Sequence, residues 1–238
     1  MYKHFDKKTY CLLIVGLLLL SISLPGCAGT ESLDPKLFQY SNTQWNMTVD
    51  EVMTALELTE DDCAVLLENN QSLIPTYIFS TNSLKLFGEK ATTVFEFRTQ
   101  AGDEYGLNAV YVLFEPNVNI SNICSRIEKQ LGPDIDAEVR SDMADASGNI
   151  GYWDSSEMMM PYIEKAYKTH GADIPESMNM LYQNMPASRL YWTSDLSHYF
   201  DLMNYEFRDL LDNDNGQSML VFHGHITPVL QNQIHGFK

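Results

Sequence analysis

The stretch TYIFSTNSLKLFGEKATTVFEFRTQAGDEYGLNAVYVLF, residues 76–114, decides the fold. It is rich in β-branched and aromatic residues, and short glycine-containing segments interrupt it. Along the third apolar run, Phe95 and Phe97 point to one face, which is therefore aromatic. Glu96 and Arg98 alternate with them and make the other face partly polar. We expect an antiparallel meander of four strands, over residues 76–80, 83–87, 91–99 and 107–114.

Helical patterns flank this meander. Thr48 and Glu51 form a capping-box pattern in front of an apolar stripe. Thr59 and the acidic residues after it supply a cap for a second, short helix. Asn119 or Ser121 caps a third segment with helical periodicity, which a Gly-Pro pair ends. Three helices are therefore expected, over residues 48–56, 63–68 and 119–131.

The second half of the chain predicts further helices and strands. The helices are expected over 157–170 and 174–184, and the strands over 189–193, 205–211 and 218–225. Asn215-Gly216 is the strongest hairpin signal and joins the last two strands. Residues 134–150 form a polar helix or loop. The fold class is therefore α+β, a helix pair packed on an antiparallel sheet, and the order of elements allows two tandem half-repeats with a helical insertion.

A resemblance appears at the first helix. WNMTVDEVMTAL, residues 45–56, resembles the W-x-M-T-x-x-E-V opening of exported bacterial lipoproteins. Some of these carry small modules like the β-lactamase-inhibitor-protein repeats. The resemblance extends loosely to residue 131, and Asn46 stands where the family often has glycine. It implies a helix pair on an antiparallel sheet, in a module that binds other proteins.

The N-terminus has the pattern of an export signal. Three lysines precede an apolar run over 11–24, which is shorter than the roughly 20 residues that a membrane span needs. LPGC, residues 24–27, follows and resembles a bacterial lipobox. The resemblance implies a signal peptide over 1–26, cleavage after Gly26, and a lipid on the Cys27 thiol that holds the protein on the outer face of the cell membrane. The alternatives are an uncleaved anchor and an ordinary secretory signal.

The remaining chain divides into a tether and a folded part. The segment 27–39 is polar and rich in small residues, so we interpret it as the lipidated cysteine and its tether. Residues 40–238 have enough apolar content for one α+β domain, with 40–132 and 133–238 as possible sub-lobes.

Net charge limits the classes of partner. The chain carries 15 Lys and Arg against 32 Asp and Glu, a net charge of −17. Without the signal peptide the net charge is near −19. Such a charge argues against nucleic-acid binding, which needs basic residues at the phosphates. It favours cationic partners or serves solubility alone, and it leaves the lipid as the contact with the membrane.

Two histidines are the candidate metal ligands. His223 and His225 fall on one face of the expected strand 218–225, a spacing at which two imidazoles can chelate an ion. A complete site needs a third ligand, such as His198 or His235. Nothing in the sequence places one.

Cysteine, methionine and aromatic residues give weaker signals. Cys63 and Cys124 either form one disulfide or stay as thiols, because Cys124 falls in the apolar stripe of the expected helix 119–131. The methionine-rich segment 158–185 offers thioethers for Cu(I), but a pliable core or contact surface explains it better. The echoed pairs Tyr152-Trp153 and Tyr191-Trp192 are expected at buried, equivalent strand positions.

No catalytic motif is present, so we expect neither an enzyme nor a cofactor. The sequence favours a non-enzymatic module of the cell envelope that binds a protein partner or assists assembly. The alternative is a metal- or small-ligand-binding lipoprotein that uses His223 and His225.

Overall fold

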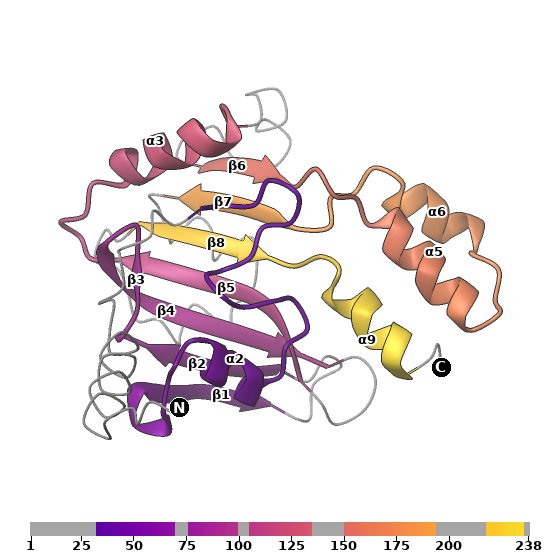
Figure 1. Cartoon of the computed structure of the whole chain (residues 1–238), viewed down its shortest axis with the longest axis horizontal. Coiled ribbons are helices and arrows are strands. Elements are labelled where there is room, and N and C mark those ends of the chain that lie inside the picture. Colours follow the sequence, from indigo (N-terminus) through magenta and orange to yellow (C-terminus); the bar gives the residue numbers. More distant parts are fainter. Residues whose placement is uncertain (1–31, 70–75, 100–104, 135–149, 194–217, 236–238) are drawn as a thin grey trace, which may run out of the picture. The chain divides into compact units, whose positions relative to one another are not determined.

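The computed structural model describes residues 32–69, 76–99, 105–134, 150–193 and 218–235. Within them, an eight-stranded antiparallel sheet has the order β1-β2-β4-β5-β8-β7-β6, and β3 pairs with β4 beside this path. The strands are β1 (Cys63–Asn69), β2 (Thr76–Thr81), β3 (Lys85–Leu86), β4 (Glu89–Arg98), β5 (Gly106–Phe114), β6 (Ile150–Asp154), β7 (Arg189–Thr193) and β8 (Met219–His223). The predicted α+β class is confirmed (Figure 1).

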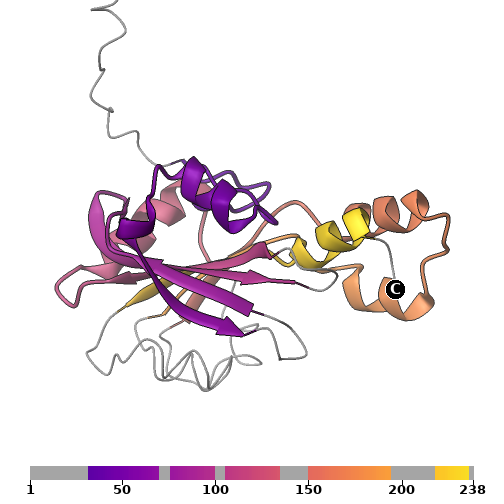
Figure 2. The ribbon, with the colours of Figure 1, turned by 90° about the horizontal axis from the view of Figure 1, so that it is seen from below.

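The described helices pack on this sheet. They are α2 (Val49–Ala55), α3 (Ile120–Leu131), α5 (Met160–Thr169), α6 (Glu176–Tyr182) and α9 (Thr227–His235), with a 3₁₀ turn η1 (Glu60–Asp62). Helices α2 and α3 cover one face of the sheet, whereas α5, α6 and α9 lie beyond one end of the strands (Figures 1 and 2). Val52, Ile123 and Ile127 bury the apolar stripes of α2 and α3 against the sheet.

Three of the four predicted meander strands are neighbours in the sheet, as β2, β4 and β5, and the two faces of β4 differ as predicted. The strand expected over 83–87 is wrong: only β3 forms there, and it pairs with the start of β4 beside the main path, so β2 pairs directly with β4. Phe95 and Phe97 are fully buried under the helices, and Phe79 stacks on them with ring centroids 4.9 and 5.6 Å away. Val94 and Val221 belong to a second buried cluster on the opposite face. The strict alternation along β4 therefore decides which side chains meet the helices.

Residues 63–68 are strand, not the predicted helix. Thr59 and Asp62 do form a capping box, but it closes only the 3₁₀ turn η1. The chain then pairs as β1 with β2, from Cys63 opposite Thr81 to Asn69 opposite Thr76. Pairing along seven residues outweighs the weak preference of so short a segment for helix.

The two halves of the chain, 40–132 and 133–238, contribute strands to the same sheet. Among the described residues, the second half runs strand, two helices, two strands and a helix, and the first half runs helix, 3₁₀ turn, five strands and helix. Strand β8 pairs with β5, from Ala109 opposite His223 to Leu113 opposite Met219, so one sheet spans both halves. Tyr152 does face Tyr191, but as a direct β6–β7 pair.

The expected tether over 27–39 belongs in part to the fold. Leu33 and Phe38 are 8% and 1% exposed, and both join the main core. The Phe38 N–H donates to Ser188 Oγ at 2.8 Å. Tyr40 then meets Phe222 edge-on, with ring centroids 5.6 Å apart. The segment is polar overall, but Leu33 and Phe38 are apolar side chains that are buried in the fold.

The opening of α2 follows the sequence closely. The Thr48 N–H donates to Glu51 Oε2 at 2.8 Å and the Glu51 N–H donates to Thr48 Oγ1 at 3.3 Å, which confirms the capping box. Asn46 has a φ of 68°. Glycine adopts this left-handed conformation most easily and asparagine is among the residues that tolerate it, which explains the type of residue found there.

Several predictions lie outside the described residues. They are the signal peptide with Cys27, the segment 135–149, the strand 205–211 and the Asn215-Gly216 hairpin. Among the described residues, no helix is both long enough and apolar enough to cross a membrane.

Candidate ligand-binding site

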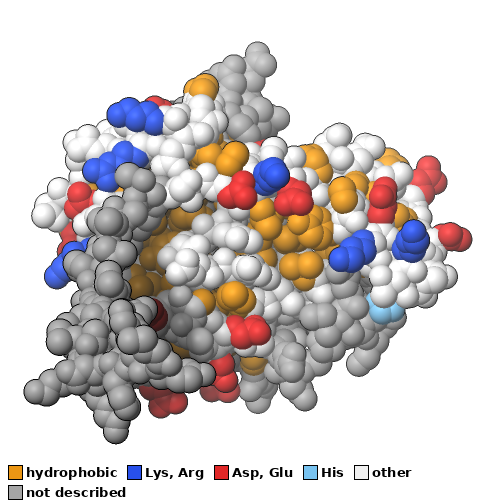
Figure 3. Space-filling view, viewed as in Figure 1, with side chains coloured by type: hydrophobic (Ala, Val, Ile, Leu, Met, Phe, Trp, Pro, Cys, Tyr) orange, Lys and Arg blue, Asp and Glu red, His pale blue; other side chains and the backbone are white. Residues whose placement is uncertain are grey.

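A cavity of about 280 Å³ lies where the ends of β4, β5 and β8 meet α5, α6 and α9. Its polar lining consists of Arg98, Asn108, His223 and His225. The rest is mostly apolar: Met159, Ile163, Tyr167, Met178, Tyr182, Met185, Gly224, Pro228 and Val229. On the face seen in Figure 3, hydrophobic side chains gather near this junction of sheet and helices, with charged side chains around them.

A β-bulge brings Asn108 to the cavity. Glu96 pairs with Ala109 and Phe97 with Leu107, so Asn108 is the extra residue of β5. A bulge re-aims a side chain. Asn108 donates to Glu96 Oε1 at 3.1 Å through its side chain, and its carbonyl accepts the Gly224 N–H at 2.9 Å. The bulge thus connects the polar face of the sheet to the segment that carries both histidines.

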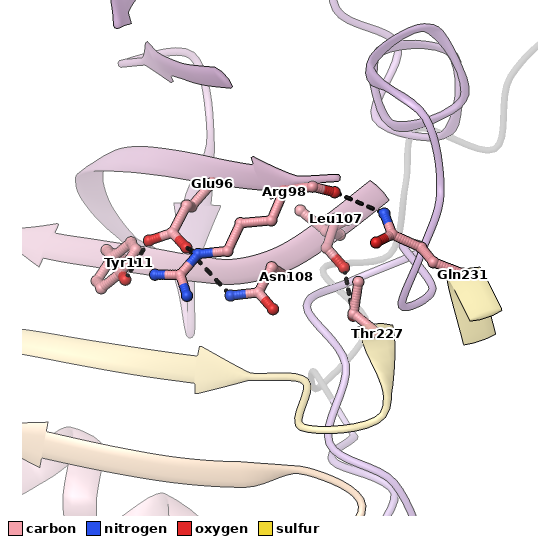
Figure 4. Close-up of polar contacts among 7 residues, drawn as sticks. All are labelled: Glu96, Arg98, Leu107, Asn108, Tyr111, Thr227 and Gln231. Carbon is pink, nitrogen blue, oxygen red and sulfur yellow. Dashed lines mark hydrogen bonds and ion pairs between the residues drawn. The ribbon is translucent and has the colours of Figure 1, made fainter. Parts of the chain in front are cut away.

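Glu96 is the centre of a buried polar network (Figure 4). Besides Asn108, it accepts a hydrogen bond from the Tyr111 hydroxyl at 2.7 Å and forms an ion pair with Arg98. The carboxylate is thereby compensated in a site where an unpaired charge would be costly. Burial and the Glu96 charge raise the pKa of Tyr111 well above its usual value, so Tyr111 remains a donor.

Two hydrogen bonds hold α9 against the sheet, and Figure 4 shows both. Thr227 Oγ1 donates to the Leu107 carbonyl at 2.7 Å, and Gln231 Nε2 donates to the Arg98 carbonyl at 2.6 Å. Each side chain satisfies a backbone oxygen at the end of a strand. Helix α9 therefore closes one side of the cavity in a fixed position.

Gly224 separates the two histidines and packs under Trp45. A Cβ atom at Gly224 would lie 2.3 Å from Trp45 Cδ2, closer than any side chain permits. His223 ends strand β8 and His225 sits in the turn that follows. Their ring centroids are 4.7 Å apart with planes at 71°. The predicted strand over 218–225 ends at His223, so the two residues do not share a strand face, and the turn brings their rings together.

Both imidazoles are neutral near neutral pH. Burial, then the neighbouring His225, Arg98 and Arg189, lower the pKa of His223 to about 3. Burial, then Arg189, also lowers the pKa of His225. Neutral imidazole keeps one nitrogen with a free lone pair, which is the form that binds metals or accepts hydrogen bonds.

The methionine side of the cavity is tied to the histidine side through the backbone. The Met159 N–H donates to the Met185 carbonyl at 2.9 Å. The next residue, Pro186, places its carbonyl oxygen 3.0 Å from His225 Nδ1. Met159, Met185 and His225 are thus fixed relative to one another by two hydrogen bonds at consecutive residues.

The other predicted site residues lie elsewhere. Cys63 and Cys124 are free thiols in the structure, so the disulfide is not formed there. Burial is the main cause that raises the pKa of Cys124 to about 12, which keeps it protonated. His198 lies outside the described residues, and so does the side chain of His235. In the part of the chain that the structure describes, no group of three or more His, Cys, Asp or Glu residues can hold a metal ion.

Sequence reasoning did not place Arg98, Asn108 or helix α9 at the site. The alternation along β4 already assigned Arg98 to the polar face. Which end of the strand meets the helices depends on tertiary packing, so the local sequence does not predict it. The bulge at Asn108 has no sequence signal that we can name.

Compared with protein-family models, curated proteins and solved structures, the chain matches none.

Proposed function

We propose that this protein is a non-enzymatic, lipid-anchored binding protein of the cell envelope, and that it holds a small ligand in the cavity at the end of its sheet. The convergence of Arg98, Asn108, His223 and His225 on one cavity carries this proposal. Small-ligand sites are typically concave and apolar, with a few polar groups. A volume of about 280 Å³ is at the lower end of their usual size, so the ligand is a metal ion or a small molecule.

Thermal unfolding of the full-length protein in detergent tests this proposal. The probes are Ag⁺, Zn²⁺, inorganic phosphate, acetate and imidazole. At a hundredfold excess over its dissociation constant, a bound probe raises the melting temperature by about 5 °C or more. Met178→Trp, which fills the cavity, abolishes the rise, whereas Met180→Trp on the exposed side of α6 does not. Failure of every probe, or an equal effect of both variants, contradicts the proposal.

The anchor is the second part of the proposal. The support is the LPGC pattern at residues 24–27, which precedes a body packed from Leu33 onward. Only residues 28–32 would then separate the lipid from the fold, a reach of at most about 18 Å. In cells given labelled fatty acid, we expect label on the wild type and none on Cys27→Ser. Labelling of that variant would contradict the lipid assignment, and Cys11→Ser is the matched control that stays labelled.

A protein contact is the second candidate function. Adjacent residues Met180 and Leu181 of α6 are 71% and 65% exposed, and methionine-rich surfaces adapt to protein partners. Cross-linking of the anchored protein in its native cells should capture one envelope protein, and Met180→Asp with Leu181→Asp should abolish that capture. Val65→Asp is the control, because Val65 of β1 is also an exposed apolar residue, at 58%. Capture that survives the α6 substitutions contradicts this candidate.

A further inference from the structure

We infer that the cavity binds a soft monovalent metal ion, Cu(I), and that His223, His225, Met159, Met178 and Met185 supply its ligands. This inference rests on the proposed function, because it names the ligand of the same cavity. All five side chains line the cavity, and they come from β8, the turn after it, and the segments around α5 and α6.

The histidine pair has the geometry of a metal clamp. The ring centroids are 4.7 Å apart, so nitrogens of both rings can reach one ion. His225 Nδ1 lies 3.0 Å from the Pro186 carbonyl oxygen, which can only accept. The proton therefore sits on Nδ1, and Nε2 keeps its lone pair. Metal-binding histidines are typically oriented by such a hydrogen bond from the other ring nitrogen to a backbone carbonyl.

The thioethers complete the set of donors. Met159 and Met185 are joined by a backbone hydrogen bond of 2.9 Å, and Met185 directly precedes the Pro186 that orients His225. Met178 adds a thioether from α6. Met180, two residues along the same helix, is 71% exposed and does not line the cavity. Three of the six methionines in the segment 158–185 thus line the cavity, and Met180 lies on the surface.

The chemistry of the lining selects a soft ion. Among the described residues that line the cavity there is no carboxylate, and Asn108 offers a single amide oxygen, whereas Ca²⁺ sites use six or more oxygens and Mg²⁺ sites one or two carboxylates. Thioethers select Cu(I), and imidazole also suits copper. Arg98 lines the cavity as well, and its charge is paired with Glu96.

An anion fits this lining less well. Arg98 is the one permanently charged side chain among the described residues that line the cavity, and its guanidinium is already engaged by Glu96. The cavity therefore offers lone pairs rather than free positive charge, and lone pairs bind an electrophile.

Metal competition on the full-length protein in detergent tests the inference. Cu(I) is supplied anaerobically with the chelator bicinchoninate, and Ag⁺ serves as its redox-inert substitute. We expect one ion per chain, and an X-ray absorption spectrum of the silver complex with both nitrogen and sulfur neighbours. His223→Gln, Met178→Leu and Met185→Leu each weaken binding about tenfold or more, and Met180→Leu leaves it unchanged. Leucine nearly conserves the volume of methionine, and melting curves verify that each variant is folded.

The outcomes separate the two proposals. Binding that Met178→Leu and Met185→Leu leave intact, a Met180→Leu effect of equal size, or a preference for Zn²⁺ overturns the Cu(I) assignment. If neither Cu(I) nor Ag⁺ binds, but another probe stabilises the wild type and not Met178→Trp, then the Cu(I) inference is wrong and the proposed function stands. If no probe binds, both are wrong.

Discussion

At the scale of single residues, the site depends on polar groups that the fold moves away from their ordinary ionisation. Burial and nearby arginines keep His223 and His225 neutral, and Glu96 contacts three polar partners. Three strands end here, so residues of β4, β5 and β8 contribute. Such clusters of perturbed groups are the usual place for binding chemistry.

The lowered pKa of His223, about 3, predicts a specific pH dependence of stability. The unfolded chain binds a proton at this histidine below about pH 6.5, and the folded chain does so only near pH 3. The contribution of His223 to the free energy of unfolding is therefore fully present above pH 6.5. It falls, by up to about 1.4 kcal/mol per pH unit, as the pH drops from 6.5 toward 3. Urea unfolding between pH 7 and 4 measures this slope. His223→Gln should reduce the slope and leave the contribution of His225, whose pKa is also lowered, and the same substitution at the exposed His170 should not change the slope.

Glu96 gives a second prediction at this scale. Glu96→Leu removes the partner of Arg98 and the acceptor of the Tyr111 hydroxyl, and we expect a loss of about 2–4 kcal/mol in the free energy of unfolding. Tyr111→Phe alone costs about 1 kcal/mol, and less in the Glu96→Leu background. Chemical denaturation of the four proteins gives the coupling energy. Strictly additive losses would mean that the two side chains do not interact.

At the scale of elements, packing between distant segments sets the conformation at the site. Trp45 comes from the N-terminal end of the described fold, yet its indole packs on Gly224. Gly224 is the residue that separates the two histidines in the sequence. Helix α9 is likewise fixed by side chains that reach strands β4 and β5. The residues that shape the site are thus contributed by elements remote in sequence.

Gly224 tests this packing. Gly224→Ala places a Cβ atom 2.3 Å from Trp45 Cδ2, and we expect a loss of about 1–3 kcal/mol from overpacking. Trp45→Leu makes room, so the additional cost of Gly224→Ala in that background should fall below about 1 kcal/mol. Thermal unfolding of the single and double variants measures both. An undiminished cost would show that the indole is not the obstacle.

At the scale of the whole molecule, one sheet unites the two halves of the chain and the N-terminal segment fastens onto it. Phe38 is 1% exposed, and its backbone N–H is bonded to Ser188 from the second half. We infer that residues 33–40 are part of the domain.

Deletions separate this view from the expected tether. Removal of residues 1–31 should leave the melting temperature unchanged, because the fold begins beyond it. Removal of residues 1–39 also takes away Leu33 and Phe38, and should cost about 3–6 kcal/mol. Calorimetry of both deletion variants measures the melting temperature and the loss in the free energy of unfolding. Lys36→Ala in the full-length chain is the neutral control, because Lys36 is exposed. Equal melting temperatures of the two deletion variants would contradict this view and support the interpretation of residues 27–39 as a tether.

The sequence by itself determined the features that depend on neighbours along the chain. The alternation of Phe95 and Phe97 with Glu96 produced the two faces of β4, and Thr48 with Glu51 produced the start of α2, because both patterns act within a few residues. Tertiary structure decided the rest. Residues 63–68 became strand because β2 offers a partner, Phe38 became core because the sheet covers it, and Asn108 reached the cavity through a bulge that its own segment does not signal. The cavity was unpredictable for the same reason: its histidines, methionines and arginine lie up to 127 positions apart, from Arg98 to His225, and only the closing of β8 onto β5 brings them together.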